Sequence, residues 1–172
     1  MQKNFSHLLA VDNISSAEKE YKIHAKASEL KQIAEILKVP AVKDFVASIY
    51  VRRQNKSPLI DVWGVVNAQI TRQSVISLEY FDRDYEAEFV MQYDVNLTEN
   101  QVRELEEEGV SDIPDVITNG EIDLCHIAME QIALELEDYP RQEGENFSFE
   151  SEFDEETDKL ENPFQILEKL KK

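Results

Sequence analysis

LIDVWGVVNAQITRQSVISLEYFDRDYEAEFVMQY, residues 59–93, is the stretch from which the fold is inferred. Every second residue in Ile60–Ile70 is apolar or glycine, and a period of two predicts a strand with one buried face. The same alternation over Tyr85–Met91 predicts another strand. Val75–Tyr80 is predicted as a short strand between the two, followed by a turn at residues 81–84. Because such short connections join antiparallel strands, the stretch predicts an antiparallel meander.

Two amphipathic helices are predicted to cover this sheet. Ser28 is the predicted cap of the first helix, and Pro40 ends it because the residue before a proline avoids the helical conformation. Asp123 is the predicted cap of the second helix, whose last residue precedes Tyr139-Pro140. The apolar stripe predicted for this second helix comprises Cys125, Ala128, Met129, Ile132, Ala133 and Leu136.

The remaining segments complete an α+β fold. Tyr21–Ala25 is predicted as an edge strand and Val42–Arg53 as a longer strand, whereas Thr98–Glu108 is predicted as a short charged helix. Residues 109–120 contain turn residues without a clear period and are predicted as a loop. The expected architecture is an antiparallel sheet, a meander of about four to five strands, covered by two main helices.

Three regions are predicted along the chain: a single α+β domain at residues 1–140, an acidic linker or tail at 141–161, and a short amphipathic helix at 162–172. The linker is dense in carboxylates and poor in apolar residues, which predicts disorder. A helix of about two turns is marginal alone, so its apolar stripe needs a surface on which to dock, in this protein or in a partner. The candidate partner-docking residues are Asn162, Pro163, Phe164, Leu167 and Leu170.

The net charge of -18 is concentrated in the second half of the chain. Residues 1–90 contain 12 Lys+Arg and 12 Asp+Glu, whereas residues 91–172 contain 6 and 24. This imbalance argues against a grip on nucleic-acid phosphates through the second half and favours a basic protein partner. A plainer alternative is that the acidic surface only keeps the protein soluble.

Arg52, Arg53 and Lys56 are the candidate RNA contacts, because they are grouped in one predicted polar connection between strands. Three cations are a weak signal for phosphate binding, and such residues more often form a solvated hairpin tip. The sequence therefore makes direct binding of nucleic acid an alternative rather than the leading interpretation.

No catalytic, cofactor-binding or metal-binding residue is predicted. The single cysteine excludes an internal disulfide and a zinc site built on two cysteines, and the chain has no phosphate-binding glycine loop, HExxH motif or EF-hand spacing. Cys125 and His126 adjoin in sequence but point about 100° apart on a helix, so they form no nucleophile–base pair. We expect a protein that is not an enzyme and needs no cofactor.

The segments expected of a secreted or membrane protein are not found in the sequence. The first residues lack a basic segment followed by an apolar one, and no apolar run approaches the roughly 18 residues that span a bilayer. We expect a soluble, cytoplasmic protein that does not contact a membrane. A monomer is expected.

Four stretches resemble one family in the same order along the chain. They are AEILKVPAV at 34–42, VWGVVNAQITRQSVISLEY at 62–80, GEIDLCHIAMEQIALELEDYPR at 120–141, and the NPF-containing terminus at 162–172. Together they resemble the YceD family, the large ribosomal RNA subunit accumulation proteins, in its alphaproteobacterial form. The chain departs from the family pattern at Ser74, where many relatives have Cys, at Tyr80, where Pro is common, and at Cys125, where Gly is usual.

The resemblance implies a role in accumulation of large-subunit ribosomal RNA and in assembly of the large ribosomal subunit, without a known catalytic activity. It implies a ribosomal protein or a large-subunit precursor as partner. Two alternatives stay open on the sequence. One is an RNA-contacting protein that uses Arg52, Arg53 and Lys56, and the other is an acidic module that mimics nucleic acid and has no connection with ribosomes.

Overall fold

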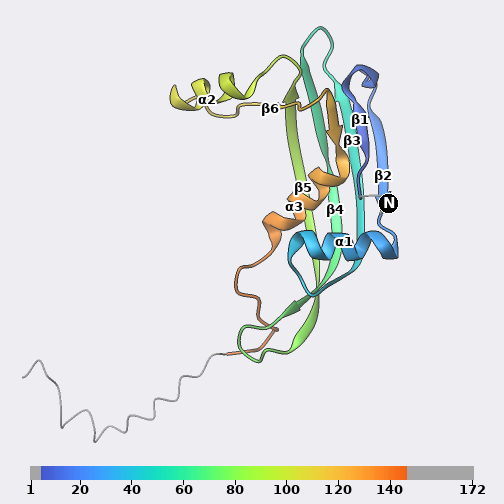
Figure 1. Ribbon diagram of the computed structural model, residues 1–172, viewed down its shortest axis with the longest axis vertical. Helices are drawn as coiled ribbons and strands as arrows, with labels where there is room; N and C mark the ends of the chain where they lie inside the picture. The colour runs from blue at the N-terminus through green and yellow to red at the C-terminus, as the bar shows by residue number, and fades with distance from the viewer. Residues whose placement is uncertain (1–4, 147–172) are drawn as a thin grey trace, which may run out of the picture. The chain divides into compact units, whose positions relative to one another are not determined.

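The computed structural model describes residues 5–146 (Figure 1). Up to Gln142 the described residues form one compact unit. The candidate docking helix at 162–172 and most of the predicted acidic linker lie outside the described residues. Their structure therefore stays a prediction, as do the domain boundaries placed after residues 140 and 161.

Within residues 5–146, the largest element is a five-stranded sheet with the order β2-β3-β4-β5-β6. Neighbouring strands from β2 to β5 are antiparallel, whereas β6 pairs parallel to the end of β5. β1 and β7 form a separate antiparallel pair. The strands are β1 (Leu8–Ala10), β2 (Lys19–His24), β3 (Ala41–Arg53), β4 (Leu59–Gln73), β5 (Tyr80–Asp94), β6 (Asp115–Val116) and β7 (Glu121–Asp123), and the helices are η1 (Val11–Asn13), α1 (Ala27–Leu37), α2 (Glu99–Glu107) and α3 (Leu124–Glu135).

The predicted α+β class is confirmed, with a sheet that is antiparallel except at β6. The edge position predicted for the first strand of the sheet is also confirmed, because β2 pairs only with β3. β6 lies within residues 109–120, which were predicted as a loop, so that prediction is wrong for two residues. A strand of this length has too few residues to show a period, and its pairing with β5 depends on the tertiary fold.

The central hairpin has two long strands instead of the three predicted. β4 and β5 pair along their whole lengths of 15 residues each. The predicted strand at Val75–Tyr80 is wrong, because residues 74–79 form the connection between β4 and β5. The predicted turn at 81–84 is wrong as well, because these residues lie inside β5.

Ser74 explains why the apolar residues after it do not continue as a strand. Its hydroxyl oxygen accepts hydrogen bonds from the backbone amides of Ile76, at 3.0 Å, and Ser77, at 3.2 Å. Such local bonds offer the backbone an alternative to strand pairing. Leu78 then adopts a φ of 63°, which reverses the chain and is unusual for a residue with a bulky side chain.

One predicted helix cap is wrong and one is confirmed. α1 begins at Ala27, one residue before the predicted cap Ser28. The carboxylate of Glu29 accepts a hydrogen bond at 2.7 Å from the backbone amide of Lys26, the residue that precedes the helix. This bond is one half of a capping box. Asp123 caps α3 as predicted, because its carboxylate accepts hydrogen bonds from two amides of the first helical turn.

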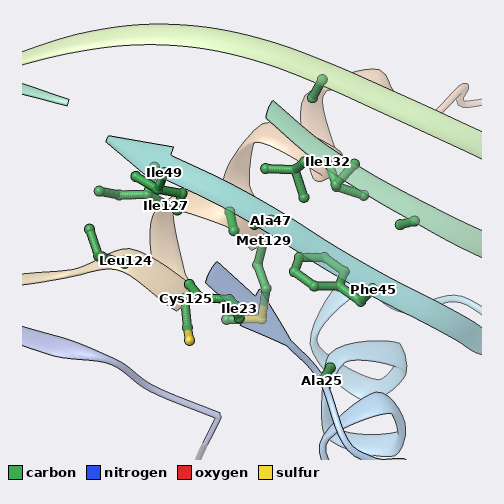
Figure 2. Close-up of a cluster of buried hydrophobic side chains, with 14 of the residues drawn as sticks. Ile23, Ala25, Phe45, Ala47, Ile49, Leu124, Cys125, Ile127, Met129 and Ile132 are labelled. Carbon is green, nitrogen blue, oxygen red and sulfur yellow. The ribbon is translucent and has the colours of Figure 1, made fainter. Parts of the chain in front are cut away.

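The hydrophobic core lies between the large sheet and the helices α1 and α3, which cover the same side of the sheet (Figure 1). Figure 2 shows Met129 and Ile132 of α3 in one cluster with Phe45 and Ile49 of β3. Burial of each large apolar side chain of this kind stabilises the fold by about 1.5–3 kcal/mol before entropy is subtracted. The alternation in β4 and β5 thus specifies the side of the sheet on which the core forms.

α3 buries a wider stripe than the sequence predicted. Leu124 and Ile127 are buried along with the predicted residues Cys125, Ala128, Met129 and Ile132. Ala133 was predicted in the stripe and is exposed, so that assignment is wrong. The reason for the wide stripe is that α3 packs against β4 and β5 on one side and against α1 on another.

Candidate interaction surface

The large sheet has one covered face and one uncovered face. Side chains buried under α1 and α3 come from every second residue of β3, β4 and β5. The alternate residues of the same strands point to the other side, over which the described part of the chain places no helix or strand (Figure 1). We call this surface the open face. It consists of the even-numbered residues of β3 from Asp44 onward, the odd-numbered residues of β4 and the even-numbered residues of β5.

An aromatic pair lies on the open face. The rings of Tyr50 and Trp63 are stacked, with centroids 5.8 Å apart and planes inclined by 17°. Val90 is opposite Trp63 in the register, and 84% of its surface is exposed. The guanidinium carbon of Arg52 lies 5.4 Å from the centre of the Trp63 ring, a cation–π distance. This part of the open face combines apolar area with planar groups, which is the composition of many protein-binding surfaces.

Asp61 forms a hydrogen-bonded cluster beside the aromatic pair. Arg52 Nη2 lies 2.9 Å from Asp61 Oδ2, while the side-chain amides of Gln54 and Gln92 donate to Oδ1 at 2.8 and 2.9 Å. Partial burial raises the pKa of Asp61, but the hydrogen bonds from Gln92, Arg52 and Gln54 outweigh it and hold the pKa below its usual value. The charge of Arg52 is therefore already engaged by a carboxylate within the protein.

Four carboxylates alternate along β5 on the open face: Asp82, Asp84, Glu86 and Glu88. We call them the acidic row. Asp82 pairs with Lys43 and accepts a hydrogen bond from Thr71 at 2.7 Å, and both contacts lower its pKa. Asp84 accepts a hydrogen bond from Gln69 at 3.0 Å.

The other two members of the acidic row form neither kind of contact with a described residue. Glu86 and Glu88 are exposed, and neither forms an ion pair with any residue that the structure describes. Residues two apart on a strand are roughly 6.8 Å from each other, so these carboxylates sum to a local negative potential on the open face.

The three predicted RNA contacts do not come together. Arg52 and Arg53 are the last two residues of β3, so their side chains point to opposite faces of the sheet. Arg53 and Lys56 line a pocket of about 480 Å³ at the β3–β4 turn, whereas Arg52 lies over Trp63 on the open face. The strand extends through Arg53, as predicted, so Arg52 and Arg53 lie on a strand and the three residues do not form one cluster on a loop.

Arg72 is a residue whose environment the sequence reading missed. It lies on the covered face, where its side chain is 8% exposed, and its Nη2 donates to the backbone carbonyl of Glu137 at 2.6 Å. Its Nη1 is buried and has no hydrogen-bond partner within residues 5–146. The signal was available, because Arg72 continues the buried alternation of Ile60–Ile70 by one further step of two residues.

Glu137 links the segment after α3 to the base of the hairpin. Its carboxylate accepts a hydrogen bond from the Tyr85 hydroxyl at 2.8 Å and pairs with the guanidinium of Arg83. Partial burial raises the pKa of Glu137, but the bonds from Tyr85 and Arg83 outweigh it and lower the pKa overall. Burial, followed by the bond to Glu137, raises the pKa of Tyr85 to about 12. These contacts fasten residues 136–141 to β4 and β5.

A pocket of about 620 Å³ lies between the end of α1 and α3, with Arg72 in its lining. Its apolar walls include Val39 and Met129, and its rim carries Lys38 and Glu130. Groups of both signs surround the pocket, so its charge selects no class of ligand.

Cys125 lies in the hydrophobic core. Cys125 is 3% exposed, and burial, with a smaller effect of Asp123, raises the pKa of its thiol to about 12. A thiol in that state is a poor nucleophile. Residues 5–146 contain no group of three or more His, Cys, Asp or Glu side chains placed to hold a metal ion. Among these same residues, no helix has both the length and the apolar character needed to cross a bilayer.

The chain matches no protein-family model, no curated protein and no solved structure. The YceD resemblance therefore rests on the four sequence stretches alone.

Proposed function

We propose that this protein is a non-enzymatic factor that supports accumulation of large-subunit ribosomal RNA and assembly of the large ribosomal subunit. In this proposal it acts by binding a basic ribosomal protein, and the open face is the binding surface. The link to the ribosome comes from the resemblance to the YceD family. The choice of a protein partner comes from the charges on the surface.

The observation that carries the binding role is the composition of the open face. Val90 is 84% exposed and the Tyr50–Trp63 pair is half-exposed, so together they provide apolar and aromatic area. Glu86 and Glu88 beside them have no ion pair within residues 5–146. Apolar area supplies affinity on association, and a surrounding potential of one sign selects a partner of the other sign. A basic protein surface meets both requirements.

RNA is a poorer match for this surface. Phosphate binding requires cations that are free to displace counter-ions. Arg52, the candidate cation on the open face beside Trp63, is paired with Asp61, and the acidic row adds negative potential along the neighbouring strand. A nucleic-acid backbone would be repelled by the same carboxylates that attract a basic protein.

The test is binding of the purified full-length protein to ribosomal proteins extracted from large subunits, measured at about 50 mM and about 500 mM salt. We expect binding to specific basic proteins, weakened at the higher salt because exposed charges are screened. Naked large-subunit RNA is the control ligand. Binding that is insensitive to salt, or binding to RNA alone, would refute the proposal. If RNA binds, a gel-shift assay that compares wild type with a variant charge-reversed at Arg52 and Arg53 shows whether these two residues hold the RNA.

A further inference from the structure

β5 has an unpaired edge on the side away from β4, over Asp84–Gln92. At one end of this segment, β6 pairs with Tyr93 and Asp94. At the other end, Arg83 holds the chain after α3 by donating to the carbonyl of Arg141 at 2.7 Å. Between these ends, no described strand lies beside β5 (Figure 1). An edge of this kind can form a ladder with another extended chain.

The side chains of this edge that point to the open face carry negative charge. Asp84, Glu86 and Glu88 point to the open face, and the last two have no ion pair within residues 5–146. Pairing of two copies of β5 would set these like charges close to one another, which is destabilising across strands. A strand with Lys or Arg at alternate positions would set opposite charges there instead.

On the covered face, the surface next to this edge is apolar. The side-chain amide of Gln131 in α3 lies 3.8 Å from the sulfur of Met91 in β5, so this side of α3 faces β5. Leu134 follows three residues later on the same side of the helix and is 74% exposed. Leu134 is thus an exposed apolar side chain on the side of α3 that faces β5. Residues of an added strand that point to the covered face would pack toward it.

We propose that the β5 edge binds an extended basic segment of a partner protein as an additional strand. Basic side chains of this segment alternate with apolar ones, so that the basic residues meet the acidic row and the apolar residues pack toward Leu134. The nine residues of Asp84–Gln92 span roughly 30 Å, enough for a strand of ordinary length. This inference rests on the proposed function, because it specifies how the basic partner is held.

Hydrogen exchange with a defined probe tests the proposal. The probe is a synthetic peptide of alternating lysine and valine, KVKVKVKV, added to the full-length protein. We expect about half of the amides in Asp84–Gln92 to exchange at least tenfold more slowly with the peptide bound, because alternate amides of a strand face its free edge. Binding without this protection would overturn strand addition. Protection already present in the free protein would also overturn it, since it would mean that the edge is occupied.

Matched variants test the role of charge. The double variant Glu86→Lys/Glu88→Lys should bind KVKVKVKV about tenfold more weakly. The double variant Glu104→Lys/Glu107→Lys changes the net charge by the same amount on exposed positions of α2 and should bind within about twofold of wild type. Equal losses in the two variants would show unspecific attraction by net charge and would overturn the assignment to β5. The block peptide KKKKVVVV should bind more weakly than the alternating one.

The same variants separate this inference from the proposed function. If wild-type protein binds ribosomal proteins and Glu86→Lys/Glu88→Lys binds them equally well, the β5 edge is the wrong surface and the function stands. If wild-type protein binds no ribosomal protein yet gains β5 protection with KVKVKVKV, the proposed function fails and the edge remains a site for basic strands. Loss of ribosomal-protein binding in the β5 variant alone supports both.

Discussion

The two faces of the hairpin β4–β5 come from one alternating sequence but differ in burial and in charge. On the covered face, Ile60, Val62 and Ile70 are fully buried. On the open face, Trp63 and Val65, drawn from the same strand, are only half-buried, and the facing residues of β5 are mostly carboxylates. Stability therefore depends mainly on the covered face, which leaves much of the open face free to serve binding.

Burial explains why the two faces tolerate change so differently. A side chain in a packed interior cannot be shortened without leaving a cavity, whereas solvent replaces an exposed one at little cost. Charge behaves in the opposite way, because carboxylates spaced along β5 are stable only where water solvates them. The following changes separate these effects, beginning with the largest.

Phe45→Ala should produce the largest loss of stability. Phe45 is fully buried on the covered face and makes an edge-to-face contact with Phe5, with ring centroids 5.7 Å apart. We expect the free energy of unfolding, measured in urea, to fall by about 3–5 kcal/mol. The control Val90→Ala on the open face should change it by less than about 0.5 kcal/mol. Similar losses for both would mean that the open face is buried in solution.

Gly64→Ala should cost less but still exceed any open-face change. A Cβ atom at Gly64 would lie 2.2 Å from the backbone carbonyl oxygen of Ser48 in β3, so the two strands would have to separate locally. We expect a loss of about 1–3 kcal/mol in the free energy of unfolding. Gly109 has a positive φ, so Gly109→Ala would add backbone strain and is an unsuitable control. Asn67→Ala serves instead, because Asn67 is an exposed residue of β4. An unchanged melting temperature for Gly64→Ala would contradict the close approach of the strands.

The cluster around Asp61 should make the free energy of unfolding depend on pH in the acidic range. The pKa of Asp61 is lowered in the folded protein, so the unfolded chain binds its proton more readily. Its stabilising contribution is present above the ordinary pKa and is lost as the pH falls from about 5 through the lowered value. We expect Asp61→Asn to reduce the slope of unfolding free energy against pH in this range. An unchanged slope in Asp61→Asn would contradict a lowered pKa of Asp61 in the folded protein.

Leu78→Gly should produce the smallest effect, and in the opposite direction. Leu78 has a φ of 63° in the turn that joins the two strands, and its side chain is 67% exposed. Glycine adopts this conformation without strain, so we expect a gain of about 0.5–1 kcal/mol after its entropic cost. Val75→Gly in the same turn, where φ is not positive, should lower stability. A loss in Leu78→Gly would show that the leucine side chain supports the turn.

Part of the candidate surface could be inferred from sequence and part could not. The alternation Tyr85–Met91 already placed Glu86 and Glu88 opposite the buried residues of their strand, as the structure has them. The turn after Ser74 was not inferred, because one hydroxyl overrides the strand preference of the apolar residues beside it. The grouping of Arg52 with Arg53 failed for a related reason, since a strand sends neighbours to opposite faces.

The sequence by itself determined the class of fold, the covered side of β4 and β5, and the cap at Asp123, because each depends on residues a few positions apart. Only the tertiary structure decided which surfaces remain uncovered. The bond between Arg72 and the carbonyl of Glu137 joins residues 65 positions apart. The free edge of β5 exists because β6, the strand that follows it in the sheet, pairs only with Tyr93 and Asp94. Contacts of this kind depend on how distant segments pack, and no local period in the sequence encodes them.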